Sequence, residues 1–199
     1  MLYAMIDVGS NTIRMAIYDI DGDRVEMLMK RKHNVGLASY VRDGVMQRQG
    51  IDKVVEIIGE YRHFLDDFGI TQVTAFTTAA LRNSVNGSQA VDEISFRTGI
   101  NIILMSGDDE ATYDFIGATH DLIDEKGLLI DIGGGSTEIV YFRDREIQVK
   151  ASLPIGSLNF HTRYTGVHIL PSTFEIAEMY AEAEATVSAW WLIARHSWM

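Results

Sequence analysis

Two short segments combine a carboxylate, glycine and hydroxyl or amide side chains, which are the residue types that hold phosphate and a divalent cation. In the later segment, Asp131 ends an apolar run, three glycines follow, and Ser136, Thr137 and Glu138 come next. Consecutive glycines let the backbone approach a phosphate closely and direct N–H groups toward it. Asp131 and Glu138 offer oxygen ligands to a cation, directly or through water. The segment therefore predicts a phosphate loop with a metal beside it.

The N-terminal segment has the same plan and begins at Asp7. Here Gly9 turns the chain, Ser10 and Asn11 are potential donors to phosphate, and Asp7 is placed to face the metal. Arg14 follows in the next strand, and its guanidinium matches a phosphate in bidentate fashion. The alternative for Arg14 is a solvated side chain on the open face of that strand.

Two further segments carry weaker signals. Hydroxyl residues from Thr77 open a helix that contains Arg82, a geometry that either caps the helix or binds an anion. At 106–111 (Ser-Gly-Asp-Asp-Glu-Ala) acidic residues open another helix. Glu110 is the candidate that would orient or deprotonate water for phosphoanhydride hydrolysis. The alternative is that acidic residues simply favour the first turn of a helix.

The pattern of apolar residues predicts the elements that position these segments. Helical spacing is present over 51–68, from the end of the 73–76 strand to about residue 97 with an interruption near 86–87, from 106 onward, and over 172–195. Strands are expected at 2–8, 12–20, 24–32, 73–76, 100–104, 128–132, 137–142 and 146–153. The order strand, Asp, glycine turn, strand occurs twice, at 6–12 and at 130–137. This internal repeat predicts a duplicated two-lobed fold with a ligand between the lobes.

Composition narrows the class of protein. The 199 residues are 47% apolar, contain no cysteine and carry a net charge of −11. A packed core is expected, whereas a disulfide scaffold is excluded and non-specific nucleic-acid binding is disfavoured. The N-terminus lacks a signal-peptide pattern, no apolar run would span a bilayer, and the six histidines lack metal-ligand spacing. We therefore expect a cytoplasmic protein with no nucleic-acid or membrane partner.

Together these segments resemble the exopolyphosphatase / guanosine pentaphosphate phosphatase family. Residues 7–14 and 131–138 resemble its two phosphate motifs, 78–86 its Arg-and-Asn helix, and 106–111 its catalytic-acid motif, with Asp109 where a second Glu is usual. Residues 152–157 resemble a following segment, after which Asn159 stands where an Arg is common. The resemblance covers roughly residues 2–165.

The resemblance implies an actin-like (ribonuclease H-like) α/β fold, with a first lobe at 1–124 and a partial, shortened second lobe at 125–199. It implies hydrolysis, dependent on Mg²⁺ or Mn²⁺, of terminal phosphate from inorganic polyphosphate or from guanosine pentaphosphate. Glu110 would activate water. Asp131, Glu138 and Asp7 would serve the metal, and the phosphate would be held by Gly9, Ser10, Asn11, Arg14, Arg82, Gly134, Gly135 and Ser136.

Some alternatives stay open at this stage. The sequence does not choose between the two substrates or between a monomer and a homodimer. The apolar, Trp-rich tail at 189–199 is unlike the family, so the chain reads as a truncated copy. An inactive phosphate-binding or nucleotide-binding module and an actin-like small-molecule kinase are the competing hypotheses.

Overall fold

The computed structural model describes residues 1–120, 123–166 and 168–194, and these residues form two compact units, Met1–Met105 and Ser106–Met199. The sequence placed the division after residue 124. Helix α4 (Gly107–Thr119) lies between these two points and packs on strands β9 and β10, so it groups with the second unit. Of the apolar tail noted at 189–199, residues 195–199 lie outside the described residues.

The first unit is built on a five-stranded mixed sheet with strand order β3-β2-β1-β6-β7. β1, β2 and β3 form an antiparallel meander, while β6 and β7 add in parallel to β1. The strand bounds are β1 Leu2–Val8, β2 Thr12–Asp21, β3 Arg24–Asn34, β6 Gln72–Thr77 and β7 Ile102–Leu104. A short 3-10 turn and a two-stranded ribbon precede the first long helix: η1 Leu37–Tyr40, β4 Val41–Arg42 and β5 Val45–Met46.

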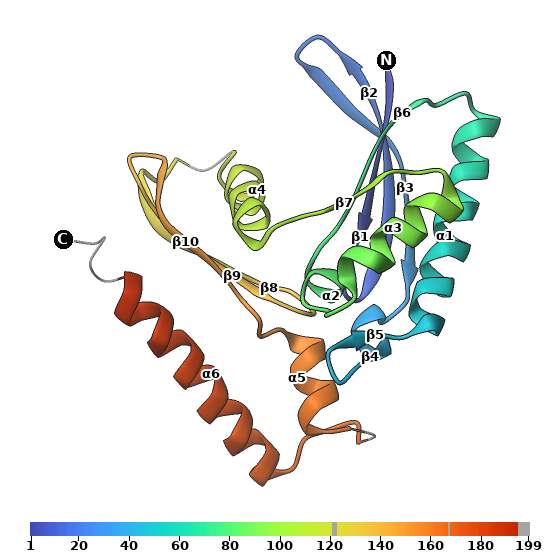
Figure 1. The fold of residues 1–199 in the computed structure, drawn as a ribbon. Helices are drawn as coiled ribbons and strands as arrows, with labels where there is room; N and C mark the ends of the chain where they lie inside the picture. The colour runs from blue at the N-terminus through green and yellow to red at the C-terminus, as the bar shows by residue number, and fades with distance from the viewer. Residues whose placement is uncertain (121–122, 167, 195–199) are drawn as a thin grey trace. The chain divides into compact units, whose positions relative to one another are not determined.

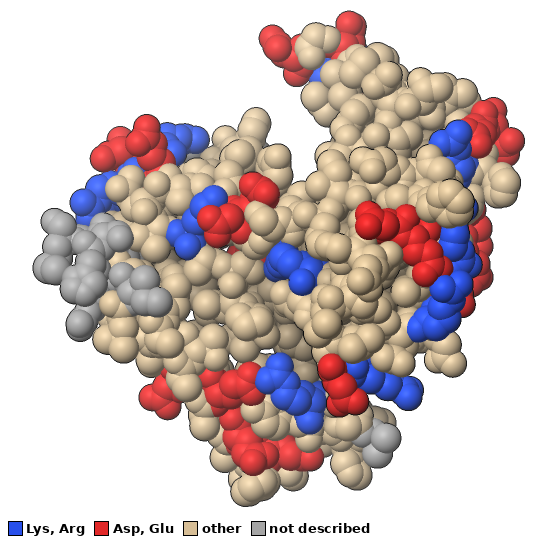
Figure 2. Space-filling view, viewed as in Figure 1, with Lys and Arg blue, Asp and Glu red and all other residues tan. Residues whose placement is uncertain are grey.

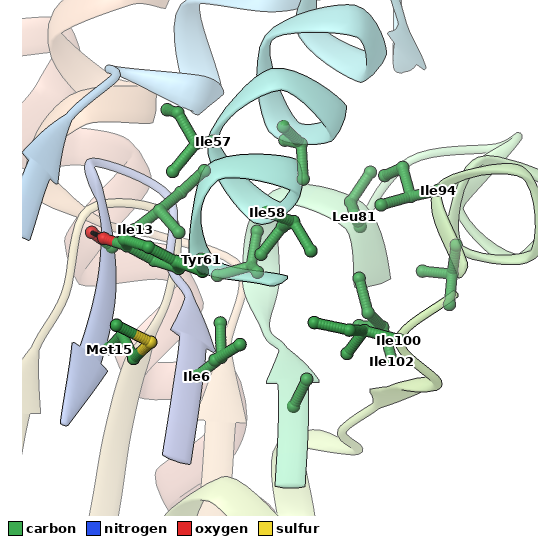
Figure 3. Packing of buried hydrophobic residues seen from close by; sticks show 14 of the residues in the cluster. Ile6, Ile13, Met15, Ile57, Ile58, Tyr61, Leu81, Ile94, Ile100 and Ile102 are labelled. Atoms are coloured by element: carbon green, nitrogen blue, oxygen red, sulfur yellow. Dashed lines mark hydrogen bonds between the residues drawn. The ribbon is translucent and has the colours of Figure 1, made fainter. Parts of the chain in front are cut away.

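Two helices, α1 (Arg48–Asp67) and α3 (Gly87–Thr98), cover one face of this sheet (Figure 1). α2 (Ala79–Arg82) is a single turn between β6 and α3. Alternate residues of β1 and β2, such as Ile6 and Met15, meet Ile58 and Tyr61 of α1 in the core (Figure 3). The buried Tyr61 hydroxyl donates to the Ile13 carbonyl at 3.2 Å. The helical spacing predicted over 51–68 is thus confirmed as a core face as far as Leu65.

The second unit has a three-stranded antiparallel sheet in the order β10-β9-β8. Its strands are β8 Lys126–Ile132, β9 Thr137–Arg143 and β10 Glu146–Leu153. α4 packs on one face, through Ala111 and Phe115 against Val140 and Phe142. On the other face, α5 (Ser157–Tyr164) and α6 (Thr173–Ala194) contribute Phe160 and Trp190 to a cluster with Ile139, Leu153 and Ile155 (Figure 1).

The expected strands and long helices are confirmed, with ends that differ by a few residues. η1, β4, β5 and α5 were not anticipated, because each is short and depends on neighbouring elements. β8 forms one edge of its sheet, and its side chains Leu128, Ile130 and Ile132 are exposed. Among the residues the structure describes, none of the helices has the length and apolar character needed to cross a membrane.

Candidate phosphate and metal site

The two glycine turns predicted as phosphate loops have the same backbone geometry. In the first, the Gly9 amide donates to the Thr12 carbonyl at 3.0 Å, and in the second the Gly133 amide donates to the Ser136 carbonyl at 2.9 Å. A Cβ atom added at either glycine would lie 3.2 Å from that same carbonyl oxygen. The internal repeat seen in the sequence is therefore a structural repeat, aligned without a gap from Ile6 and from Ile130.

The carbonyls of each loop are held by the segment that follows the third strand of its unit. Amides of Val35 and Gly36 both donate to the Asn11 carbonyl at 2.8 Å. In the second unit, the Ser157 amide donates to the Gly133 carbonyl at 2.9 Å, and the Leu158 and Asn159 amides donate to the Gly134 carbonyl. A peptide's N–H points opposite to its C=O. Fixing these carbonyls therefore turns the following amides away from the supporting segment, which is the orientation an anion-binding loop requires.

Asn159 fixes the triglycine loop with its side chain as well. Its Nδ2 donates to the carbonyls of Gly135 at 3.0 Å and Pro154 at 3.1 Å, and its Oδ1 accepts from the Gly156 amide at 2.7 Å. Gly156 also lies against the loop, since an added Cβ would be 2.6 to 2.8 Å from backbone atoms of Gly134 and Gly135. The position where the family usually has an Arg is thus occupied by a residue that binds the loop backbone.

Three carboxylates converge beside this loop, within the second unit. Asp131 at the end of β8 is opposite Glu138 of β9, so their side chains project from the same face of the sheet. Asp114 of α4 faces them, and one ligand oxygen from each residue lies within 4.8 Å of the other two. Glu138 is 1% exposed, and its Oε1 accepts from the Ser152 hydroxyl at 2.6 Å.

The charge of this cluster is unbalanced. Burial, followed by the negative charges of Asp131, Glu138 and Glu110, raises the pKa of Asp114 to about 7. The Asp114 Oδ2 atom is buried and has no hydrogen-bond partner among the residues that the structure describes. A buried acceptor without a donor, next to two further carboxylates, fits a divalent cation, which would satisfy the oxygen and offset the repulsion. The residues that would hold it are Asp114, Asp131 and Glu138.

The predicted water-activating residue lies on the same helix as Asp114. Glu110 is partly buried in the first turn of α4, one helical turn before Asp114, so both project toward the same side. Its neighbour Asp109 has a local role. The Asp109 amide donates to the Ser106 hydroxyl at 3.1 Å, and that hydroxyl donates to the Asp109 carboxylate at 2.7 Å. The capping interpretation therefore holds for Asp109, while Glu110 is left beside the carboxylates.

The two predicted phosphate-binding arginines of the first unit have different contacts. The Arg14 guanidinium lies 3.9 Å from the Asp7 carboxylate, and its Nε donates to the Thr12 hydroxyl at 3.1 Å. Arg82 closes α2 and donates to the Met105 carbonyl at 3.3 Å. Asp7 therefore contacts a cation that the chain itself supplies, and its assignment to the metal stays a prediction.

Sequence reasoning missed Asp114 and the clamping role of Asn159. The signal for Asp114 was its position four residues after Glu110, which places both on one face of a helix. For Asn159, the only signal in the sequence was that it stands at a position where the family commonly has an Arg. The grouping of Asp131 with Glu138 follows directly from the hairpin register.

Comparison with solved structures identifies the class of fold. The exopolyphosphatase of Cytophaga hutchinsonii matches with a TM-score of 0.84 and 28% identity, over 94% of this chain and 61% of that one. The Ppx/GppA protein of Aquifex aeolicus matches with a TM-score of 0.71 and 25% identity, over 95% of this chain and 62% of that one. The chain has the α/β actin-like (ribonuclease H-like) ATPase fold, with one complete lobe and a partial second lobe. This confirms the predicted fold class.

The family follows from the sequence comparison. The model of the Ppx/GppA phosphatase family matches residues 16–194, so the chain belongs to the Ppx/GppA phosphatase family. Exopolyphosphatase 1 of Mycobacterium tuberculosis is 29% identical over 161 residues, which cover 79% of this chain and 47% of that protein. The chain spans about half the length of the curated relatives it matches.

Proposed function

We propose that this chain carries the metal-binding and phosphate-binding residues of a phosphohydrolase that releases terminal phosphate from inorganic polyphosphate or from guanosine pentaphosphate. The observation that carries the proposal is the convergence of Asp114, Asp131 and Glu138 beside a glycine loop with fixed carbonyls. Family membership and the exopolyphosphatases among the similar proteins support the same reaction class.

In the proposed reaction, water attacks the terminal phosphorus and the bridging P–O bond breaks. The products are inorganic phosphate and a chain shorter by one unit. Glu110 orients the water and accepts its proton. The amides of Gly134 and Gly135 and the Ser136 hydroxyl hold phosphate oxygens, and the first loop (Gly9, Ser10 and Asn11) with Arg14 and Arg82 holds further ones.

Asp114, Asp131 and Glu138 hold Mg²⁺ or Mn²⁺ in this proposal. When bound, the cation neutralises charge on the phosphate oxygens. Asn159 contributes by holding the second loop in position.

A substrate panel tests the proposal. The chain is incubated with Mg²⁺ and long-chain polyphosphate, guanosine pentaphosphate, or ATP with small-molecule acceptors, and both free phosphate and transferred phosphate are measured. The proposal predicts free phosphate from at least one of the first two substrates. Transfer from ATP to an acceptor would support the kinase hypothesis, and binding without any release would support a non-catalytic module.

A further inference from the structure

Three cations lie on one face of the first unit's sheet, next to its phosphate loop. In the β2–β3 register, Arg14 is opposite Lys32, and Ala16 is opposite Lys30. Directly opposite residues project from the same face, and so do residues two apart on one strand. Arg14, Lys32 and Lys30 therefore share a face. Arg31, between the lysines, projects from the other face and lies over the Phe64 ring of α1 at 4.9 Å.

Both lysines are exposed and lack an ionic partner. Among the residues that the structure describes, the side chain of neither Lys30 nor Lys32 has a hydrogen-bond or ion-pair partner. Nearby ions are paired, as Arg24 is with Glu26 at 2.6 Å and the N-terminal amine is with Asp19 at 3.1 Å. On the face shown in Figure 2, most Lys and Arg side chains likewise lie beside Asp or Glu side chains. Arg14 itself is paired with Asp7, so the two unpaired lysines supply the local excess of positive charge.

The spacing of the three cations suits a chain of phosphates. Cross-strand neighbours lie about 5 Å apart, and residues two apart on a strand lie about 7 Å apart. Arg14 is two residues beyond Thr12, whose carbonyl closes the first loop, so the row starts at that loop and continues toward the β2–β3 turn. The loop itself holds the first phosphate units of a ligand. Only the units that extend beyond these would reach the row of cations.

We propose that Arg14, Lys32 and Lys30 form a binding track for the phosphate units of inorganic polyphosphate that extend beyond the first loop. The inference rests on the proposed function and narrows its substrate, because polyphosphate carries a charge on every unit, whereas the phosphate tail of a nucleotide is short. A row of exposed cations that starts at the loop matches such a repeating polyanion.

A competing account is that Lys30 and Lys32 only protect an edge strand, since β3 is the edge of its sheet and lysines prevent edge-to-edge pairing. The two accounts differ in what they predict for ligands of different length. Protection of the edge predicts no effect on any phosphate ligand. The track predicts an effect on long chains alone.

The test compares Lys30→Gln/Lys32→Gln with Arg24→Gln/Arg31→Gln, which makes the same change in charge on the same strand but on the opposite face. Dissociation constants are measured for long-chain polyphosphate and for tripolyphosphate with Mg²⁺ at two salt concentrations, with thermal unfolding as the check on folding. We expect the lysine variant to bind the long chain about 10-fold more weakly and tripolyphosphate within about 2-fold of the unsubstituted chain. For the long chain, the slope of log binding constant against log salt concentration should become shallower by about 0.7 per lost contact, the value for single-stranded nucleic acids.

Equal binding of the long chain by both variants, or an equal loss for the long and short ligands, would overturn the track while leaving the proposed function intact. RNA that competes as well as long-chain polyphosphate would overturn the choice of ligand. Failure of the unsubstituted chain to bind either phosphate ligand would overturn the track together with the proposed function.

Discussion

Asp131 and Glu138 are paired across β8 and β9 at the register position that Asp7 and Arg14 occupy across β1 and β2. The turns between the strands are the same, but one hairpin brings together opposite charges and the other brings together two negative ones. Like charges directly opposite each other destabilise a strand pair. The Asp7–Arg14 pair is therefore neutral in itself, whereas the Asp131–Glu138 pair is not, which fits the proposed cation at the second hairpin.

We predict that Glu138→Gln weakens Mg²⁺ binding by at least about 10-fold, because it removes one charged ligand and leaves the hairpin intact. The Gln carbonyl oxygen can still accept from the Ser152 hydroxyl, so the fold is preserved. Isothermal titration calorimetry measures the affinity, with Glu146→Gln at an exposed position of β10 as the charge-matched control. Equal affinities in the two variants would remove Glu138 from the metal site.

We predict that Asp114→Asn stabilises the metal-free protein more at pH 8 than at pH 5. The pKa of Asp114 is raised to about 7, so the folded state keeps a proton on it that the unfolded state has released. Between pH 4 and 7 the folded protein binds more protons, and the Asp114 contribution to the free energy of unfolding therefore falls as pH rises.

The Asn side chain removes this penalty, on the order of 1 kcal/mol after allowance for partial solvent exposure. Thermal unfolding in EDTA at the two pH values measures it, as the difference between variant and unsubstituted chain. A variant that is destabilised more at pH 8 than at pH 5 would contradict the assignment. With Mg²⁺ added, the unsubstituted chain should gain more stability at pH 8 than the variant does.

We predict that Asn159→Ala loosens the triglycine loop and weakens tripolyphosphate binding about 10-fold. The variant loses two donors to loop and turn carbonyls and the acceptor for the Gly156 amide. Arg163→Ala on the same helix is the control, since Arg163 pairs with Glu182 of α6 and does not touch the loop. Faster hydrogen exchange of the loop amides in Asn159→Ala alone is the expected result, and matched losses in both variants would indicate a general effect of α5.

We predict opposite effects of two Gly→Ala substitutions. At Gly156 the new Cβ would lie 2.6 Å from the Gly135 nitrogen, so the substitution should destabilise the second unit by about 1–3 kcal/mol. At Gly117 in α4, nothing lies within 4 Å of the new Cβ, and Ala should stabilise the helix by about 0.5–1 kcal/mol. Denaturant titration measures both, and a neutral Gly156→Ala would mean that the α5 contact with the loop is not tight.

Local signals in the sequence were sufficient for the hairpins and their loops. A glycine turn between two apolar strands fixes the register, and the register places Asp131 opposite Glu138. Asp114 could not be found in this way, because an acidic residue on a helix is common and it is tertiary packing, such as that of Phe115 on Phe142, that brings the helix to the sheet. The role of Asn159 depends on three backbone groups at separate positions, which no single motif displays. The assignment of α4 to the second unit depends on the same packing.

The most direct test of the central claim is phosphate release from long-chain polyphosphate with Mg²⁺, compared between this chain and its Glu110→Gln variant. Glu110 lies beside the carboxylates that would hold the metal, and the amide would keep its shape while losing the ability to accept a proton. The account predicts release by the chain and a loss of at least about 100-fold in the variant, with Mg²⁺ affinity changed little. Release that persists in Glu110→Gln would contradict the assigned role, and no release from the unsubstituted chain would contradict the proposed activity.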